Sequence, residues 1–80
     1  MHDRSLGSLV RSRRQRLRLK QAELAELAGC STRFVHAVEV DKATVRLDKL
    51  IDVLRVLGLG LRVVSDTGLH SEPDGEDRSR

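Results

Sequence analysis

The chain has 80 residues, of which 39% are hydrophobic and 34% charged, and Phe34 is its one aromatic residue. A chain of this length forms one small domain with a marginal core, which excludes a catalytic domain beside a cofactor domain. Cys30 is the single cysteine, so an internal disulfide and a cysteine-based zinc site are excluded as well. The longest apolar runs are a few residues long, against the roughly 18 residues that cross a bilayer, and we find no secretory signal. We therefore expect a small cytoplasmic protein that binds a partner.

The charges divide the chain into two parts. Residues 1–65 carry 13 basic and 7 acidic groups, a balance of +6, and residues 66–80 carry 2 basic and 5 acidic groups, a balance of −3. Residues 11–20 contain six of the cations and no acid. Such a cluster attracts phosphates and releases counterions on binding. A solvated helix face carries similar charges, so charge alone leaves both interpretations open.

The first part of the chain contains the patterns of two helices. Leu6, Val10 and Leu17 recur at helical spacing and predict a helix between the first and the last of them, with these three on one apolar face and arginines over the rest. A second helix is expected over residues 21–28, where leucines and alanines alternate with glutamates. Gly29 ends it, because glycine tolerates the positive φ that a helix C-terminus requires.

Two further helices are expected downstream. Ser31 or Thr32 can cap a third helix, which runs to about Glu39, and residues 40–45 form a loop because they carry no helix signal. A fourth helix is expected over residues 47–57, where apolar residues again repeat at helical spacing.

After the fourth helix the apolar period changes to two, which predicts one short strand over residues 59–64. A lone strand leaves its backbone groups unpaired. We therefore expect this strand to pair with its copy in a second chain, helped by Val53 and Val56 of the fourth helix. The residues expected to make the dimer contact are Leu59, Leu61 and Val63.

Residues 21–40 meet the steric requirements of a helix-turn-helix. Two helices cross steeply only where a small residue lets their backbones approach, and Ala25 occupies that position. The sharp turn requires a permissive residue, which is Gly29. The apolar contacts that fix the crossing angle fall on Leu24, Ala28, Cys30, Val35 and Val38.

The sequence of residues 19–31, LKQAELAELAGCS, resembles the helix-turn-helix of phage-repressor-like (XRE or Cro/CI type) regulators. The run from Val45 to Leu50, followed by Leu57-Gly58 and the short strand, is similar to the HipB-type antitoxins of bacterial toxin–antitoxin operons. The resemblance covers about residues 6–64.

This resemblance implies a mostly α, lambda-repressor-like bundle of about four helices, in which residues 1–65 form a DNA-binding and dimerisation domain. Residues 66–80, which are acidic and nearly devoid of apolar side chains, are expected to form a disordered tail. The resemblance also implies that Arg14 pairs with Glu39 and ties the first helix to the third. Lys20 departs from the family, which usually has a threonine cap there.

In this motif the third helix lies in the major groove with its N-terminal residues at the base edges. Arg33 is the expected base reader, because a guanidinium can bond guanine O6 and N7 together. Gln21 resembles the family position that anchors the DNA backbone, and the lysines are expected on phosphates, which position without specifying sequence. His36 has the alternative of a solvated surface histidine. The expected DNA-binding residues are Lys20, Gln21, Ser31, Thr32, Arg33, His36 and Lys42.

Nothing in the sequence favours catalysis. The three histidines are scattered, and we find neither a glycine-rich phosphate loop nor a carboxylate pair near a pocket. Cys30 occupies a core position of the motif, which disfavours a reactive thiol. Phe34 could touch a thymine methyl, but a lone aromatic residue in a small core is more often buried. We therefore expect no enzyme activity, no metal and no cofactor.

The sequence predicts a homodimeric repressor that binds an inverted-repeat operator in double-stranded DNA, with half-sites about 34 Å apart or a multiple of that. The resemblance adds a second role, the neutralisation of a HipA-like serine/threonine kinase toxin by direct binding. Three alternatives remain open: a stand-alone XRE-type repressor without a toxin, a purely protein-binding inhibitor with a vestigial motif, and non-specific nucleic-acid binding through residues 11–20. The expected location is the bacterial cytoplasm, at the nucleoid and away from the membrane.

Overall fold

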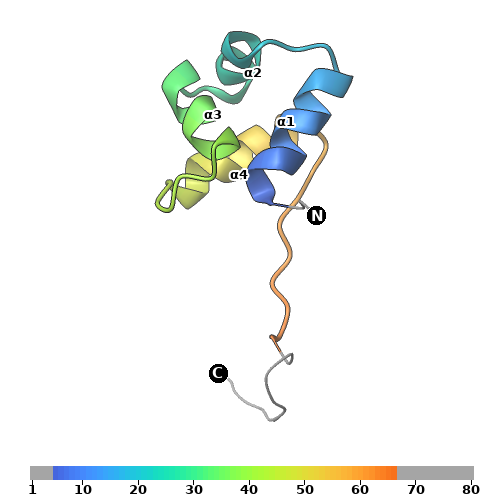
Figure 1. Ribbon diagram of the computed structural model, residues 1–80, viewed down its shortest axis with the longest axis vertical. Helices are drawn as coiled ribbons and strands as arrows, with labels where there is room; N and C mark the ends of the chain where they lie inside the picture. Colours follow the sequence, from blue (N-terminus) through green and yellow to red (C-terminus); the bar gives the residue numbers. More distant parts are fainter. Residues whose placement is uncertain (1–4, 67–80) are drawn as a thin grey trace.

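The computed structural model describes residues 5–66, so the expected tail lies outside the described residues apart from Asp66. Figure 1 shows the helices gathered into one bundle, from which the chain after the last helix extends away. The second helix packs against the third and the fourth, and the first packs against the third. The mostly α fold and the order of the helices are as expected. The four helices are α1 (Leu6–Arg16), α2 (Gln21–Ala28), α3 (Thr32–Glu39) and α4 (Leu47–Val56).

All four helices and the residue after α4 contribute to the buried core, in which no side chain is more than 5% exposed. Leu24, Val35 and Val38, which were expected to fix the helix-turn-helix angle, are all buried there. Ala25, expected where the two backbones approach, is only 2% exposed. The buried core consists of Val10, Leu24, Ala25, Val35, Val38, Leu50, Val53, Leu54 and Leu57.

Each helix ends at a residue in the left-handed conformation. At the end of α2, the amide of Cys30 donates to the carbonyl oxygen of Ala25 at 2.9 Å, and the other three helices end with the same bond to the fifth residue back. This is the Schellman arrangement, which satisfies carbonyls that the helix leaves unpaired. It confirms the predicted stop after α2. The left-handed residues are Arg18, Gly29, Asp41 and Gly58.

The face of α1 that packs against the bundle differs from the predicted one. Val10 is fully buried, but Leu6 is 38% and Leu17 49% exposed, so the prediction that the three share the buried face is wrong. Gly7 and the half-buried Arg14 flank Val10 instead, at the i, i+3, i+7 spacing of one helix face. A search for large apolar residues cannot find a face built from a glycine and an arginine.

Gly7 lies where α1 comes closest to α3. A Cβ atom at this position would lie 2.5 Å from the carbonyl oxygen of Glu39 and 2.6 Å from that of Val38. The amide of Gly7 donates to Oδ1 of Asp41 at 2.8 Å, so the loop after α3 also caps the start of α1. The negative charge of Asp41 there is favourable to the helix dipole.

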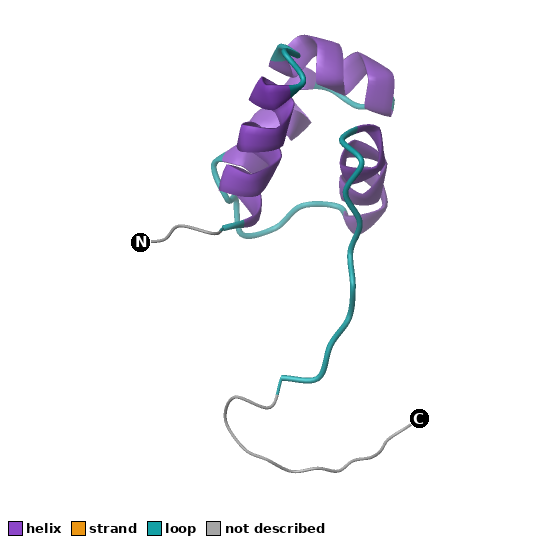
Figure 2. Ribbon diagram, turned by 90° about the vertical axis from the view of Figure 1, so that its right-hand side faces the viewer, coloured by secondary structure: helices purple, strands orange, loops and turns teal. Residues whose placement is uncertain are grey.

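The described residues contain no strand. After α4 the chain runs outward without regular structure (Figure 2), and a strand whose partner is a second chain has nothing to pair with in a single chain. Pairing therefore stays a prediction. Leu59 packs against the chain's own core, whereas Leu61 is 52% and Val63 98% exposed. Val53 is fully buried and Val56 packs against the core, so the expectation that Val53 faces a partner is wrong.

Replacing Gly7 with alanine should lower the free energy of unfolding by about 1–3 kcal/mol, because the new methyl group would collide with the backbone of α3. Urea denaturation measures the change. The matched control is Gly60→Ala, where an added Cβ meets nothing within 4 Å, and its effect should stay within about 0.5 kcal/mol. Equal effects of the two substitutions would contradict the close approach of α1 to α3.

Candidate nucleic-acid interface

The carboxylate of Glu39, the last residue of α3, binds side chains from α1 and α2. Nε of Arg14 donates to it at 2.6 Å and a terminal nitrogen of the same guanidinium at 3.0 Å, while Nε2 of Gln21 donates at 3.0 Å. Only 3% of the Glu39 side-chain surface and 12% of that of Arg14 are exposed. The expected pair of Arg14 with Glu39 is thus confirmed, and it fixes the C-terminal end of α3 in the bundle.

Two opposing effects act on the pKa of Glu39. Burial raises it, because an enclosed carboxylate loses the water that stabilises its charge. The hydrogen bonds from Arg14 and Gln21, together with the charges of Arg14 and Arg11, outweigh burial and hold the pKa below its ordinary value. Glu39 is therefore ionised at neutral pH, and it serves as a structural tie.

Gln21 and Lys20 lie at the start of α2. The amide of Gln21, expected on the DNA backbone, is half-buried and engaged by Glu39, so it belongs to the network that holds the helices together. The side chain of Lys20 is exposed and available to a phosphate. Its backbone amide donates to Oε1 of Glu23 at 2.7 Å, but a lysine side chain cannot accept the reciprocal bond that a threonine cap would.

The N-terminal end of α3 is fixed by Ser31, whose Oγ accepts a hydrogen bond from the amide of Phe34 at 3.0 Å. Ser31 is therefore the cap, and Thr32 is the first residue of the helix. Thr32, Arg33 and His36 are all exposed. The helix thus offers to solvent the polar side chains expected at the base edges.

A hollow of about 280 Å³ lies between α3 and the loop that leads to α4. Its lining includes Arg33, Lys42 and Arg46 as well as Ser31. Thr32 and His36 lie outside this hollow, on another exposed part of α3. Lys20 and Gln21 are at the start of α2 and do not line this hollow. The expected residues therefore fall into separate groups, and their contacts with DNA stay predictions.

Sequence reasoning missed Arg46 as a member of this surface. Its guanidinium bonds the carboxylate of Asp48 at 2.8 and 3.2 Å, and this hydrogen bond lowers the pKa of Asp48. Both side chains are exposed, so the pair is weak and a phosphate can compete for the guanidinium. No local pattern indicates this, because the path of the loop after α3 decides whether Arg46 lies beside Arg33.

Phe34 is half-buried, packs against the core and also lines the hollow. Cys30 is half-buried against the same core, and burial raises the pKa of its thiol, which keeps the thiol protonated, in agreement with a core position. Within residues 5–66, no group of three or more metal-ligating side chains is present. No helix in that range is long and apolar enough to cross a membrane.

Residues 5–65 match a family described as a helix-turn-helix domain. The chain belongs to this helix-turn-helix family. It is also 37% identical over 60 residues, 75% of this chain and 79% of the relative, to an uncharacterised HTH-type transcriptional regulator, y4mF, of Sinorhizobium fredii (strain NBRC 101917 / NGR234). These matches confirm the resemblance to XRE-type helix-turn-helix regulators, and neither extends to the HipB type.

Replacing Glu39 with glutamine should lower the free energy of unfolding by about 3 kcal/mol at pH 7, because Arg14 loses its buried partner. The pKa of Glu39 is lowered by folding, so its contribution is present above the unfolded value of about 4.5 and is lost as the pH falls through the folded value. The difference between wild type and variant should therefore shrink below about pH 4.5 in urea denaturation.

Glu26→Gln is the control for this pH dependence. Glu26 is an exposed acid on α2, so its replacement should change stability by less than about 0.5 kcal/mol at any pH. A stability difference for Glu39→Gln that stays constant from pH 7 to pH 3.5 would contradict an ionised tie.

Proposed function

We propose that this protein is a sequence-specific repressor that places α3 in the major groove of an inverted-repeat operator and binds it as a homodimer. The observation that supports the proposal is a recognition helix fixed at both ends. Ser31 caps its start and Glu39 ties its end to α1 and α2. Between them Thr32, Arg33 and His36 are exposed. Because the helix backbone is already fixed, binding to DNA costs little free energy for ordering it.

Separate residues supply specificity and affinity. Arg33 is the base reader, since its guanidinium can bond two guanine acceptors at once. Lys42 and Arg46, which line the same hollow as Arg33, bind the phosphates beside it, and Lys20 binds a phosphate at the start of α2. Phosphate contacts fix the register of the helix in the groove and make binding dependent on salt.

Arg33→Ala should weaken binding to the operator upstream of the gene by about tenfold or more while barely changing binding to random duplex. Lys42→Ala should weaken both about equally and reduce the salt dependence. The control is Arg55→Ala, which removes the same charge from an exposed position of α4 and should leave both affinities unchanged. Fluorescence anisotropy at several salt concentrations, including about 0.15 M, measures all four proteins.

Two results would contradict specific recognition. Unchanged operator affinity of Arg33→Ala would favour a protein-binding inhibitor with a vestigial motif. Equal affinity of the wild type for operator and random duplex would favour non-specific binding through residues 11–20.

We further propose that the protein neutralises a HipA-like serine/threonine kinase toxin encoded beside it. The similarity of the run from Val45 to Leu50, followed by Leu57-Gly58 and the predicted strand, to HipB-type antitoxins supports this role. Membership of the helix-turn-helix family is equally consistent with a stand-alone repressor, the alternative function.

Co-expression with the neighbouring reading frame distinguishes these functions. An antitoxin should co-purify with a kinase-like protein encoded there and suppress its kinase activity on a peptide substrate, because the proposed neutralisation acts by direct binding. An unrelated helix-turn-helix regulator with the same tag is the control. Absence of a kinase-like neighbour, or a kinase that passes unbound through the column, would leave the stand-alone repressor.

A further inference from the structure

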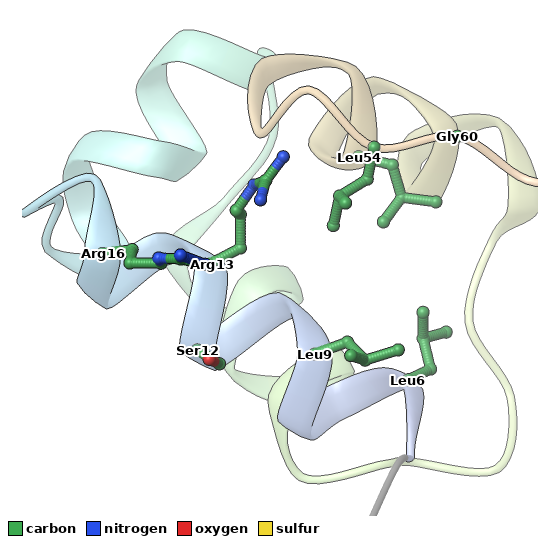
Figure 3. Close-up of a pocket in the computed structure, with 8 residues that line it drawn as sticks. Leu6, Leu9, Ser12, Arg13, Arg16, Leu54 and Gly60 are labelled. Atoms are coloured by element: carbon green, nitrogen blue, oxygen red, sulfur yellow. The ribbon is translucent and has the colours of Figure 1, made fainter.

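A second surface is rich in leucine and contains none of the residues proposed to bind DNA. A pocket of about 210 Å³ lies between α1 and the end of α4. In Figure 3, Leu6 and Leu9 project from α1 toward Leu54 of α4. Leu6 is 38% and Leu9 48% exposed. The leucine groove, as we call it, is lined by the leucines Leu6, Leu9, Leu54 and Leu59 together with Ser12, Arg13, Arg16 and Gly60.

One hydrogen bond joins the two walls of the leucine groove, and a second shapes the wall formed by α4 and the residues after it. Nε of Arg13 on α1 donates to the carbonyl oxygen of Leu57, the residue after α4, at 2.9 Å. The amide of Leu59 donates to the carbonyl oxygen of Leu54 at 2.8 Å, which turns the chain back over α4. The groove is therefore formed before anything binds in it, so a ligand need not order it.

The segment that follows exposes apolar side chains, although Leu61 also lies beside Ile51 and Leu54 of its own chain. Gly60 lines the groove, and residues 61–64, which we call the arm, come directly after it. Within the arm, Leu61 is 52%, Val63 98% and Val64 71% exposed. Figures 1 and 2 show the arm leading away from the bundle, so it does not cover the groove of its own chain.

We propose that the leucine groove receives the arm of a second copy of this chain, so that two protomers exchange arms. This inference rests on the homodimer of the proposed function and assigns its contact surface. In an extended arm Leu61 and Val63 share one face and Arg62 faces the other way. Leu61 and Val63 can therefore enter the groove while Arg62 points away from the cations Arg13 and Arg16 that also line it.

Symmetry favours a second copy over any other occupant. The groove and the arm belong to one chain and adjoin each other at Gly60, so a two-fold axis beside them fills both grooves with both arms at once. A two-stranded ribbon of arms alone would be only marginally stable in water. Packing its apolar face on the grooves provides the missing burial and replaces the expected contact through Val53, which is buried in its own chain.

Analytical ultracentrifugation of the full chain tests the groove. Leu9→Glu, in the groove, and Leu61→Glu, in the arm, should each raise the dimer dissociation constant at least tenfold. Leu27→Glu is the matched control, since Leu27 is an exposed leucine (63%) on α2, a helix that lines none of the groove, and it should leave the constant unchanged. Circular dichroism should show all three variants folded, because each replaced leucine is about half exposed or more.

Cross-linking determines which chain supplies the arm. In a Cys30→Ala background, a chain with Leu9→Cys is mixed with a longer, tagged chain carrying Val63→Cys and oxidised. A disulfide that joins the two lengths is expected, since it requires Cα atoms within about 7 Å of each other. A third chain carries both Leu9→Cys and Val63→Cys. If its disulfide forms within one chain and not between two chains, the exchange of arms is wrong.

If the Leu9→Glu variant still forms the dimer, the groove is not the contact surface, but the proposed homodimer remains. A monomeric wild type would overturn this inference together with the dimer of the proposed function. Base reading by Arg33 would be unaffected by either result, because the comparison of operator with random duplex tests it separately.

Discussion

The orientation of α3 depends on one enclosed carboxylate. Glu39 accepts hydrogen bonds from Arg14 of α1 and Gln21 of α2, and two residues further on Asp41 caps the start of α1. An ion pair this buried adds little net stability over an apolar contact, because both charges lose their water. The ion pair instead selects one packing of the helices, because any other packing would leave buried charges without partners. A helix that reads bases needs such a defined orientation.

The short helices explain why their ends are so fully bonded. They contain between 8 and 11 residues, and isolated helices shorter than about 12–15 residues are marginal in water. Packing and capping must therefore supply their stability. All four end in the Schellman arrangement, although Arg18 and Asp41 adopt a left-handed conformation that costs a residue with a Cβ about 1 kcal/mol. Asp41 offsets this cost through its bond to the amide of Gly7.

Local signals made much of the fold predictable. A glycine stop at Gly29 and a serine cap at Ser31 each act within a few residues, so the bounds of α2 and α3 agree with the prediction. Gly7 was missed because a close approach of two helices depends on a partner distant in sequence. Arg46 was missed because its place beside Arg33 depends on how the loop folds back. The pattern of residues 59–64 predicts an extended segment, but a single sequence does not contain the partner that makes it a strand.

The structure also shows that several of the basic residues 11–20 have partners within the protein. Successive positions on an α-helix point about 100° apart, so neighbouring arginines of α1 have different partners. Arg14 binds Glu39, Arg13 binds the carbonyl oxygen of Leu57, and Arg16 lies at the margin of the leucine groove. These cations do not form one DNA-binding face, and the charge of the segment overstates its attraction for phosphates. The cations in the hollow beside α3 are therefore stronger support for DNA recognition than the larger number of cations in α1.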